Sequence, residues 1–455
     1  MANSYLTHSG STPTLNTKCT LSVWLKRSKI DSDQTFCSID SSGSDEIYYR
    51  FRSDNQLQVY AGIANGQIFN YRTNRLFRDT SAWYHIVVAI DTTASSGNRM
   101  KIYVNGVQET SFQSSNEMSQ NSVLAFLSGT YAIGRKNNIT GNYFDGYLSH
   151  VAFVDGSVVA PTSFGETDST SGIWKFKSPS GVTWGTNGFH LKFENSGALG
   201  TDSSGQSNTF TVNGNLKQAV DTPSNNYTTL NPLNNHNSIF SLSKGGNTAT
   251  CTSSWNTTTS SLAMTKGKWY WEVKYTQKGQ LAAGVGQEVN LNTYRNSTAN
   301  TRASDYAHAY ELLSNGLKYS LTGNGSGSGA SYTSTINNGD IVMFAFDATN
   351  GALWAGVNGT WANSATKSEI EAGTVTNAMY SSMPGANSET WFCVTSPEAS
   401  GGGSTHGIID FNFGNGFFGT TQITSAGSNG NGSLFEYDVP SGYYALNTKN
   451  LNTYG

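Results

Sequence analysis

Glu166 and Asp168 form a pair of carboxylates at alternate positions, in the sequence Glu166-Thr167-Asp168. On a β-strand alternate side chains project from the same face, and two such carboxylates can serve as nucleophile and acid in glycoside hydrolysis. Here the pair is followed by Ser169-Thr170-Ser171, with no third carboxylate, in a stretch rich in Gly, Ser and Thr. That composition predicts a loop. We therefore expect an ordinary turn at this position, and we expect the protein to have no catalytic residues.

Other patterns associated with catalysis or phosphate binding are equally weak. The seven histidines include no HExxH motif and no pair four residues apart, and His85, His150 and His190 fall within expected strands, where histidines usually pack. The glycine-rich segment 323–329 lacks the Lys and the following helix of a phosphate-binding loop. The net charge is -3 and no Lys/Arg cluster stands out, so nucleic acid is not an expected partner.

Aromatic residues in expected loops are the best candidates for contact with a ligand. Sugar recognition uses planar rings that are exposed beside polar side chains, and loops commonly carry such contacts. One Trp follows an Asn-Gly turn, and three Tyr lie in or beside the long expected loop 287–309. Each of them is more often structural, but together they offer a contact surface. The candidate ligand-binding residues are Tyr294, Tyr306, Tyr310 and Trp361.

The composition favours an all-β protein. The chain has 455 residues, of which 36% are apolar, 13% are charged and 49 are Gly, while Asn, Ser and Thr are abundant. Long amphipathic helices need Glu, Lys, Leu and Ala, which are scarce here, whereas short strands joined by tight turns suit these residues. The length allows two or three domains.

The sequence predicts a protein that folds in a cytoplasm and does not insert into a membrane. The N-terminal segment Met1–Tyr5 has neither a basic nor an apolar signal region, and no apolar run reaches transmembrane length. The four cysteines show no CxxC or zinc spacing, so we interpret them as free buried thiols rather than disulfides: Cys19, Cys37, Cys251 and Cys393.

The first half of the chain has a ladder of short β-branched and aromatic segments. They include 19–26, with Ser22-Val-Trp-Leu25, then 83–91, with Trp83-Tyr-His85 before an apolar run, 101–106, with Tyr103-Val-Asn-Gly106, and 144–154. In Leu57-Gln58-Val59-Tyr60 the alternation marks a strand with one wet face. In this order the blocks resemble laminin-G-like jelly rolls of the concanavalin A type over about residues 1–157.

The second half contains the segment Ile341 to Gly359, IVMFAFDATNGALWAGVNG, in which Asn350-Gly351 between two apolar runs predicts a two-residue hairpin turn. With the segments 267–275, 283–286 and 316–319 and the late 411–414, it resembles the SPRY domain, whose loops bind other molecules. The long insertions, 287–309, 323–331 and 360–389, prevent the binding loops of that family from being assigned here. We therefore expect two tandem antiparallel β-sandwiches of the concanavalin A-like jelly-roll type.

One block lies in an unexpected place. Segment 188–214 resembles the opening strands of a laminin-G-like sandwich, but it follows that domain, which begins directly at 15–26. We expect a circular permutation in which 189–193 and 209–212 return to close the first sandwich, because natural sheets cover exposed edges. Their expected core residues are Leu191, Phe193, Phe210 and Val212. The expected domains are then 1–222 and 237–455, with a linker at 223–236.

The laminin-G resemblance also implies candidate calcium sites at the rim of the sandwich, since many such sandwiches hold Ca2+ there through Asp side chains and carbonyls. Solvated turn residues are the alternative for each weak candidate, and otherwise no cofactor is expected. The candidates are Asp31, Asp33, Asp40, Asp45 and Asp202.

Two such sandwiches with low charge and much Gly, Asn, Ser and Thr resemble tail-fibre and appendage proteins of bacteriophages. The resemblance implies a virion protein that recognises a host-surface glycan or other receptor without covalent chemistry, contacts other virion proteins and forms a homo-oligomer, with a trimer favoured. Two alternatives remain at this point. One is a structural or decoration protein of the capsid or tail, and the other is a glycan hydrolase.

Overall fold

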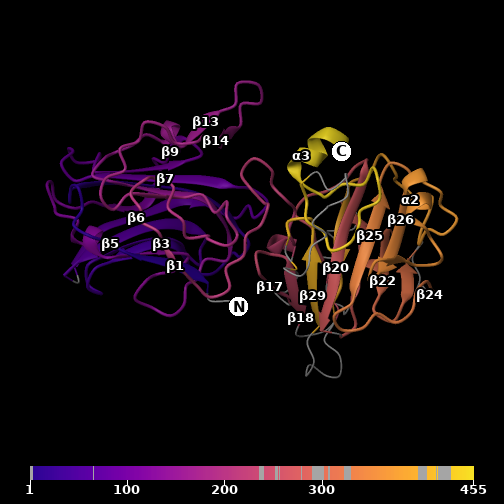
Figure 1. Ribbon diagram of the computed structural model, residues 1–455. Coiled ribbons are helices and arrows are strands. Elements are labelled where there is room, and N and C mark those ends of the chain that lie inside the picture. The colour runs from indigo at the N-terminus through magenta and orange to yellow at the C-terminus, as the bar shows by residue number, and fades with distance from the viewer. Residues whose placement is uncertain are drawn as a thin grey trace. The chain divides into compact units, whose positions relative to one another are not determined.

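The chain forms two all-β units in a computed structural model (Figure 1). The first unit comprises Met1–Gln218 with Thr222–Ser224, and the second comprises Ala219–Asp221 with Asn225–Gly455. Each unit is a sandwich of antiparallel sheets. The structure describes residues 4–64, 66–234, 240–251, 255, 257–277, 279–288, 302–305, 308–321, 329–397, 407–416, 418 and 432–455.

The larger sheet of the first unit has eight strands. Its strands alternate between apolar residues that face the core and polar or aromatic residues that face outward, as period-2 patterning requires. In spatial order they are β10 (Phe112–Asn116), β6 (Gly66–Leu76), β5 (Gln56–Ile63), β4 (Glu46–Phe51), β3 (Gln34–Asp40), β11 (Thr130–Ile133), β1 (Tyr5–Ser9) and β16 (Thr211–Asn213).

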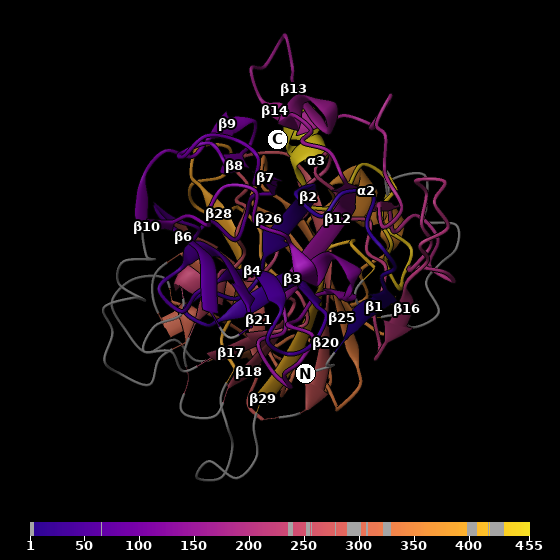
Figure 2. The same ribbon diagram turned by 90° about the vertical axis from the view of Figure 1, so that its left-hand side faces the viewer.

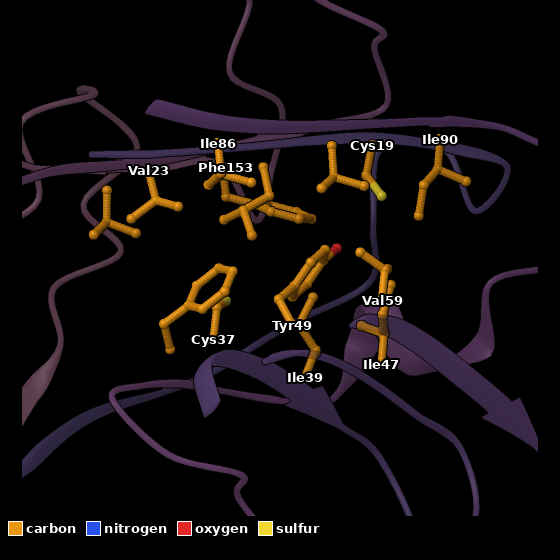
Figure 3. Close-up of a cluster of buried hydrophobic side chains, with 14 of the residues drawn as sticks. Cys19, Val23, Cys37, Ile39, Ile47, Tyr49, Val59, Ile86, Ile90 and Phe153 are labelled. Atoms are coloured by element: carbon orange, nitrogen blue, oxygen red, sulfur yellow. The ribbon is translucent and has the colours of Figure 1, made fainter. Parts of the chain in front are cut away.

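The second sheet of this unit has six strands and packs face to face with the first. Figure 3 shows Cys19, Val23 and Ile86 from this sheet pointing toward Ile47 and Tyr49 of the opposite sheet. All four cysteines are free and buried, as predicted. The strands, in spatial order, are β15 (Phe189–Leu191), β12 (Gly146–Asp155), β2 (Lys18–Arg27), β7 (Tyr84–Asp91), β8 (Met100–Val104) and β9 (Val107–Gln108).

The displaced block closes both sheets of the first unit. β15 pairs with β12, and β16 pairs with β1, so the predicted return of 188–214 to the first sandwich is confirmed. Leu191 and Phe210 are buried in its core, and Phe193 packs against it. The prediction for Val212 is wrong: it is 39% exposed, because β16 is a three-residue strand at the edge of the sheet and none of its residues is buried.

The N-terminal segment also differs from the expectation that the sandwich begins at residue 15. Residues Tyr5–Ser9 form β1, which lies between β11 and β16 and buries Leu6. Five residues with a single large aliphatic side chain give almost no periodic signal, so the strand is defined by its two neighbours.

A small hairpin lies outside the two sheets of the first unit. β13 (Gly165–Thr167) pairs with β14 (Trp174–Phe176), and Figures 1 and 2 both place this hairpin near β9. Two short 3-10 helices, η1 (Ala125–Ser128) and η2 (Pro161–Ser163), complete the unit.

The second unit has a seven-stranded and a six-stranded sheet. The first contains β17 (Phe240–Ser243), β18 (Thr248–Cys251), β29 (Gly407–Asn412), β20 (Lys268–Gln277), β25 (Ile341–Asp347), β26 (Ala352–Val357) and β27 (Thr360–Trp361). The second contains β19 (Thr258–Thr259), β28 (Trp391–Thr395), β21 (Ala282–Gln287), β22 (Ala309–Leu313), β23 (Leu317–Ser320) and β24 (Ala330–Ser331). Its described helices are η3 (Pro232–Asn234), η6 (Ala303–Asp305), α2 (Lys367–Ala372) and α3 (Thr448–Tyr454).

The turn at Asn350-Gly351 is longer than predicted. β25 and β26 pair with Asp347 opposite Ala352, which leaves four residues in the loop, and of these only Gly351 has a positive φ, at 66°. The Asp347 side chain accepts the backbone N–H of Asn350 at 2.9 Å and stabilises this wider loop. The two-residue Asn-Gly turn occurs instead at Asn358-Gly359, where φ is 48° and 85° and Val357 pairs with Thr360.

Candidate functional site

The structure separates the four aromatic residues that the sequence grouped as a contact surface. Tyr294 and Tyr306 lie outside the described residues. The prediction for Tyr310 is wrong, because it lies on β22, is only 4% exposed and packs with ring centroids 4.9 Å from Tyr380 and 6.0 Å from Trp391. Trp361 is half-buried on the edge strand β27, with its ring edge-on to Tyr270.

The five aspartates proposed for calcium each have a partner within the protein. Asp33 binds Arg50, and Asp31 accepts from the side chain of Asn55. The other three accept backbone N–H groups: Asp40 from Gly43, Asp45 from Ala64, and Asp202 from His190, Ser204 and Asn208. Among the described residues no group of three or more His, Cys, Asp or Glu is arranged to hold a metal ion.

The Glu166–Asp168 pair projects from the small hairpin rather than from either main sheet. Glu166 lies on β13, not in a loop as expected, and Asp168 follows that strand. The ammonium group of Lys175 binds both carboxylates, at 3.5 and 3.0 Å. Hydrogen bonds to Asp168 from Ser171, Lys175 and Thr170 lower the pKa of its carboxyl.

A second Glu-x-Asp sequence, Glu436-Tyr437-Asp438, lies in the C-terminal segment. The carboxyl group with an unusual environment in this region belongs instead to a residue of strand β20. The buried Glu272 of β20 accepts the backbone N–H groups of Glu436 and Tyr437, each at 2.8 Å, and burial raises the pKa of Glu272 to about 7. This carboxylate anchors the C-terminal segment on the sheet.

Ser22 and His85 form a side-chain pair that resembles a nucleophile and its base, and the sequence did not reveal it. Ser22 Oγ lies 2.8 Å from Nε2 of His85, while Nδ1 accepts the indole N–H of Trp174 at 2.9 Å. An indole nitrogen can only donate, so neutral His85 must carry its proton on Nε2 and donate to Ser22. In this tautomer the imidazole cannot take a proton from the serine.

The outer face of the eight-stranded sheet offers a different kind of site. On β4 and β5 the core residues alternate with outward residues, and the register places Tyr48 opposite Tyr60 and Arg50 opposite Gln58. On β6, Asn70 lies opposite Tyr60. Because neighbouring strands are about 4.8 Å apart, these side chains lie side by side across the sheet. Tyr48 and Gln58 are buried, at 9% and 4% exposed, and Arg50, Tyr60 and Asn70 are half-buried. We call it the Tyr48–Tyr60 face, defined by Tyr48, Arg50, Gln58, Tyr60 and Asn70.

The two tyrosine rings of this face stack on each other. Their centroids are 5.0 Å apart and the planes differ by 17°. The guanidinium carbon of Arg50 lies 5.1 Å and the Lys136 ammonium nitrogen 4.9 Å from the centroid of the Tyr48 ring. Burial raises the pKa of the Tyr48 hydroxyl, so this phenol is a neutral donor and acceptor at ordinary pH.

A hydrogen-bond network fixes the polar side chains around the rings. Arg50 donates from Nε to Gln58 at 2.8 Å and from Nη1 to Asp33 at 2.9 Å, and Gln58 donates to Asn70 at 2.7 Å. On the other side Lys136 binds Glu46 at 2.8 Å. Held in this way, the amides and charged groups lose little additional side-chain freedom when a ligand binds.

The arrangement suits a polyhydroxylated ligand. Planar rings provide apolar contact to the C–H groups of a sugar, and fixed amide, guanidinium and carboxylate groups exchange hydrogen bonds with its hydroxyls. A partial signal was present in the sequence: the predicted wet face of Leu57–Tyr60 carried Gln58 and Tyr60, of which Tyr60 is half-buried and Gln58 is buried. Nothing in that segment, however, shows that Tyr48 of the neighbouring strand lies directly opposite Tyr60.

Comparison with known proteins agrees with the architecture of the first unit. Residues 1–162 match the sequence model of a family described as the concanavalin A-like lectin/glucanases superfamily. No curated protein matches the chain. Among the described residues, no helix has the length and apolar character needed to cross a membrane.

Solved structures similar to the chain are distant. The SPRY domain of human HERC1 shows 12% identity and a TM-score of 0.27, covering 38% of this chain and 91% of that one. A protein from Bacteroides ovatus ATCC 8483, described as a "putative carbohydrate binding protein", shows 18% identity and a TM-score of 0.34, covering 47% of this chain and 56% of that one. A human SPRY domain shows 12% identity and a TM-score of 0.25, covering 38% and 94%. The class of fold, two tandem antiparallel β-sandwiches, follows from the strand pairing of the chain itself.

Proposed function

We propose that this protein binds a glycan without covalent chemistry, through the Tyr48–Tyr60 face of its first unit. The observation that carries the proposal is the stacked tyrosine pair, at 5.0 Å, set among fixed Arg, Gln and Asn side chains. The match of residues 1–162 to a lectin and glucanase superfamily supports it. The pairing of Glu166 and Asp168 with Lys175, and the tautomer of His85, favour binding over hydrolysis.

We further propose that the glycan belongs to a host cell surface and that the protein is a bacteriophage appendage, such as a tail fibre. The support is the composition, rich in Gly, Asn, Ser and Thr and low in charge, together with tandem sandwiches. In this proposal the protein resides in the virion, contacts other virion proteins and forms a homo-oligomer, with a trimer favoured. In this proposal no cofactor takes part in glycan contact.

Binding of the full-length protein to a panel of surface polysaccharides tests the first proposal. Tyr60→Ala should weaken binding about fivefold, because an aromatic contact contributes roughly 1 kcal/mol. Tyr103→Ala is the matched control, since Tyr103 is a half-buried tyrosine on the opposite sheet, and it should bind like the unchanged protein. Equal weakening by both substitutions, or none by Tyr60→Ala, would contradict the Tyr48–Tyr60 face.

The same preparation separates the alternatives. Release of reducing ends from a bound polysaccharide would establish a hydrolase. Antibodies to the protein should label intact virions and block their adsorption to host cells. Labelling without any block of adsorption would instead establish a decoration protein, and absence from virions would refute the appendage proposal while leaving glycan binding to be judged by its own assay.

A further inference from the structure

The outer face of the six-stranded sheet in the first unit is covered by a segment of its own chain. We call residues 156–188 the capping segment; it includes η2 and the β13–β14 hairpin. Ala152 and Val154 on the outer side of β12 are buried against Phe164, with Val182 and Trp184 packed beside them. Beneath the hairpin, outward residues of β2 and β7 are almost fully buried, with Ser22, Trp24 and His85 each at most 2% exposed.

The β14 strand attaches to this face through two aromatic residues, and each of them rests on a histidine. The Trp174 ring stacks on His85, which in turn stacks on Trp24, with centroid distances of 6.0 and 4.6 Å. The Phe176 ring stacks on His150 at 3.6 Å, with planes 12° apart. These two residues alternate along β14, so both point toward the sheet while Lys175 points away and is exposed.

His85 must be neutral for its hydrogen bond with Trp174 to form, and at least one of His150 and His190 must be neutral for theirs. Nδ1 of His85 accepts the Trp174 indole N–H, so a proton at Nδ1 would place two donors against each other. Nδ1 of His150 lies 3.3 Å from Nε2 of His190, so one of the two nitrogens must accept. Protonating both rings would bring two cations together without an acceptor between them.

The surrounding charges do little to favour protonation of either anchor. Burial lowers the pKa of His85 to about 3, and Asn105 accepts only the backbone N–H of this residue. Burial first, and then the charges of His190 and Lys192, lower the pKa of His150 to about 3. Asp202 acts on His190 and raises its pKa, yet burial and Lys192 still lower that pKa to about 4. On the hairpin, the acidic groups Glu166 and Asp168 are paired with Lys175, and Lys177 donates to the carbonyl of Thr162.

We propose that the β13–β14 hairpin is an acid-released cap, which leaves the outer face of the six-stranded sheet when His85 and His150 become protonated. In the released state each imidazole recovers an ordinary pKa of about 6.5. Because the released state then binds protons more tightly than the capped state, the equilibrium constant for capping should fall about tenfold per pH unit for each histidine as the pH falls below that value. Release exposes Ser22, Trp24 and His85, an aromatic and polar surface that is closed at neutral pH.

Hydrogen exchange of the full-length protein, corrected for the intrinsic pH dependence of exchange, tests the cap. Protection of the amides in β13 and β14 should be constant above pH about 7 and should fall about a hundredfold per pH unit between about pH 6 and pH 4, because two protons are taken up. Amides of β2 and β7 should remain protected over the same range. Constant protection of the hairpin, or its loss together with β2 and β7, would overturn the proposal.

His85→Gln distinguishes histidine titration from other acid effects. A glutamine can accept from Trp174 and donate to Ser22, yet it does not titrate. The loss of hairpin protection in this variant should therefore be only about tenfold per pH unit. His8→Gln is the matched control, because His8 lies on β1, away from the hairpin, and it should keep the hundredfold dependence. If His85→Gln does not fold, Trp174→Phe serves instead: it keeps a ring but removes the donor that opposes protonation, and it should also reduce the dependence. An unchanged hundredfold dependence in the variant that folds would show that His85 is not the switch.

Discussion

Asp155 and Asn187 are joined by a hydrogen bond from the Asn187 backbone N–H to Oδ2 of Asp155, at 3.1 Å. The same carboxylate oxygen accepts the backbone N–H of Thr14 at 2.8 Å. The Asn187 side chain accepts from Ser11 and donates to the carbonyls of Ser11 and Leu127. One buried pair thus ties the end of β12 to the N-terminal segment and to the chain that leads into β15.

Asn187→Ala should destabilise the first unit by about 2 kcal/mol, because it removes several hydrogen bonds and leaves buried backbone groups without partners. Calorimetry of the full-length protein should show a lower melting temperature for one transition and no change in the other. Asn208→Ala, which removes two backbone contacts of an exposed segment, is a milder comparison. Equal effects of the two substitutions would argue against a special role for Asn187.

Truncation tests the return of the displaced block. A fragment ending at Gly172 lacks β15 and β16, loses the buried Leu191 and Phe210 and leaves two sheet edges open, so it should be insoluble or unfolded. A fragment ending at Asn226 retains both strands and should fold. Circular dichroism and size-exclusion chromatography of the two fragments decide the matter, and a well-folded shorter fragment would contradict this account.

Glu272 predicts a pH dependence of the second unit. Burial raises its pKa from 4.5 to about 7 in the folded protein, so the carboxyl contributes stability that is complete below pH about 4.5 and is lost as the pH rises through about 7. The total is about 3 kcal/mol, at about 1.4 kcal/mol per unit of pKa shift. Burial raises the pKa of Glu311 as well, which gives a dependence of the same sign.

Melting of the second unit should therefore occur at lower temperature at pH 8 than at pH 5. Glu272→Gln should reduce this difference in melting temperature between pH 5 and pH 8, since a glutamine does not titrate. Glu371→Gln, on α2 and half-buried, is the matched control and should leave the difference unchanged. Rising stability between pH 5 and pH 8 in the unchanged protein would refute the assignment.

Gly165→Ala should loosen the hairpin at neutral pH. A Cβ at this position would lie 2.5 Å from Cζ2 of Trp174, so the indole must move off His85. Hydrogen exchange of β14 should be faster than in the unchanged protein at pH 7.5. Gly197→Ala, where the nearest atom is 3.4 Å away, is the control and should exchange normally. A Gly165→Ala variant with full protection would show that Trp174 is not wedged as described.

The sequence alone determined the strand content, the all-β class and the free cysteines, because alternation and the scarcity of strong helix formers are local properties. It also located segment 188–214 as a missing part of the first sandwich. It did not place the N-terminal strand, whose five residues acquire order only from β11 and β16. It misassigned the loop at Asn350-Gly351, where the side chain of Asp347 stabilises a wider turn.

The candidate sites were decided by tertiary structure. Tyr48 and Tyr60 meet because the β4–β5 register sets them opposite each other, and a shift of one residue would place the ring of the shifted strand on the core face. His85 meets Trp174 across 89 residues of sequence, through a hairpin that lies outside both sheets. Conversely, Tyr310 reads as a loop aromatic but is buried, because β22 begins one residue before it. Periodicity reports which face of a strand is wet, whereas the partners on that face depend on register and on long-range packing.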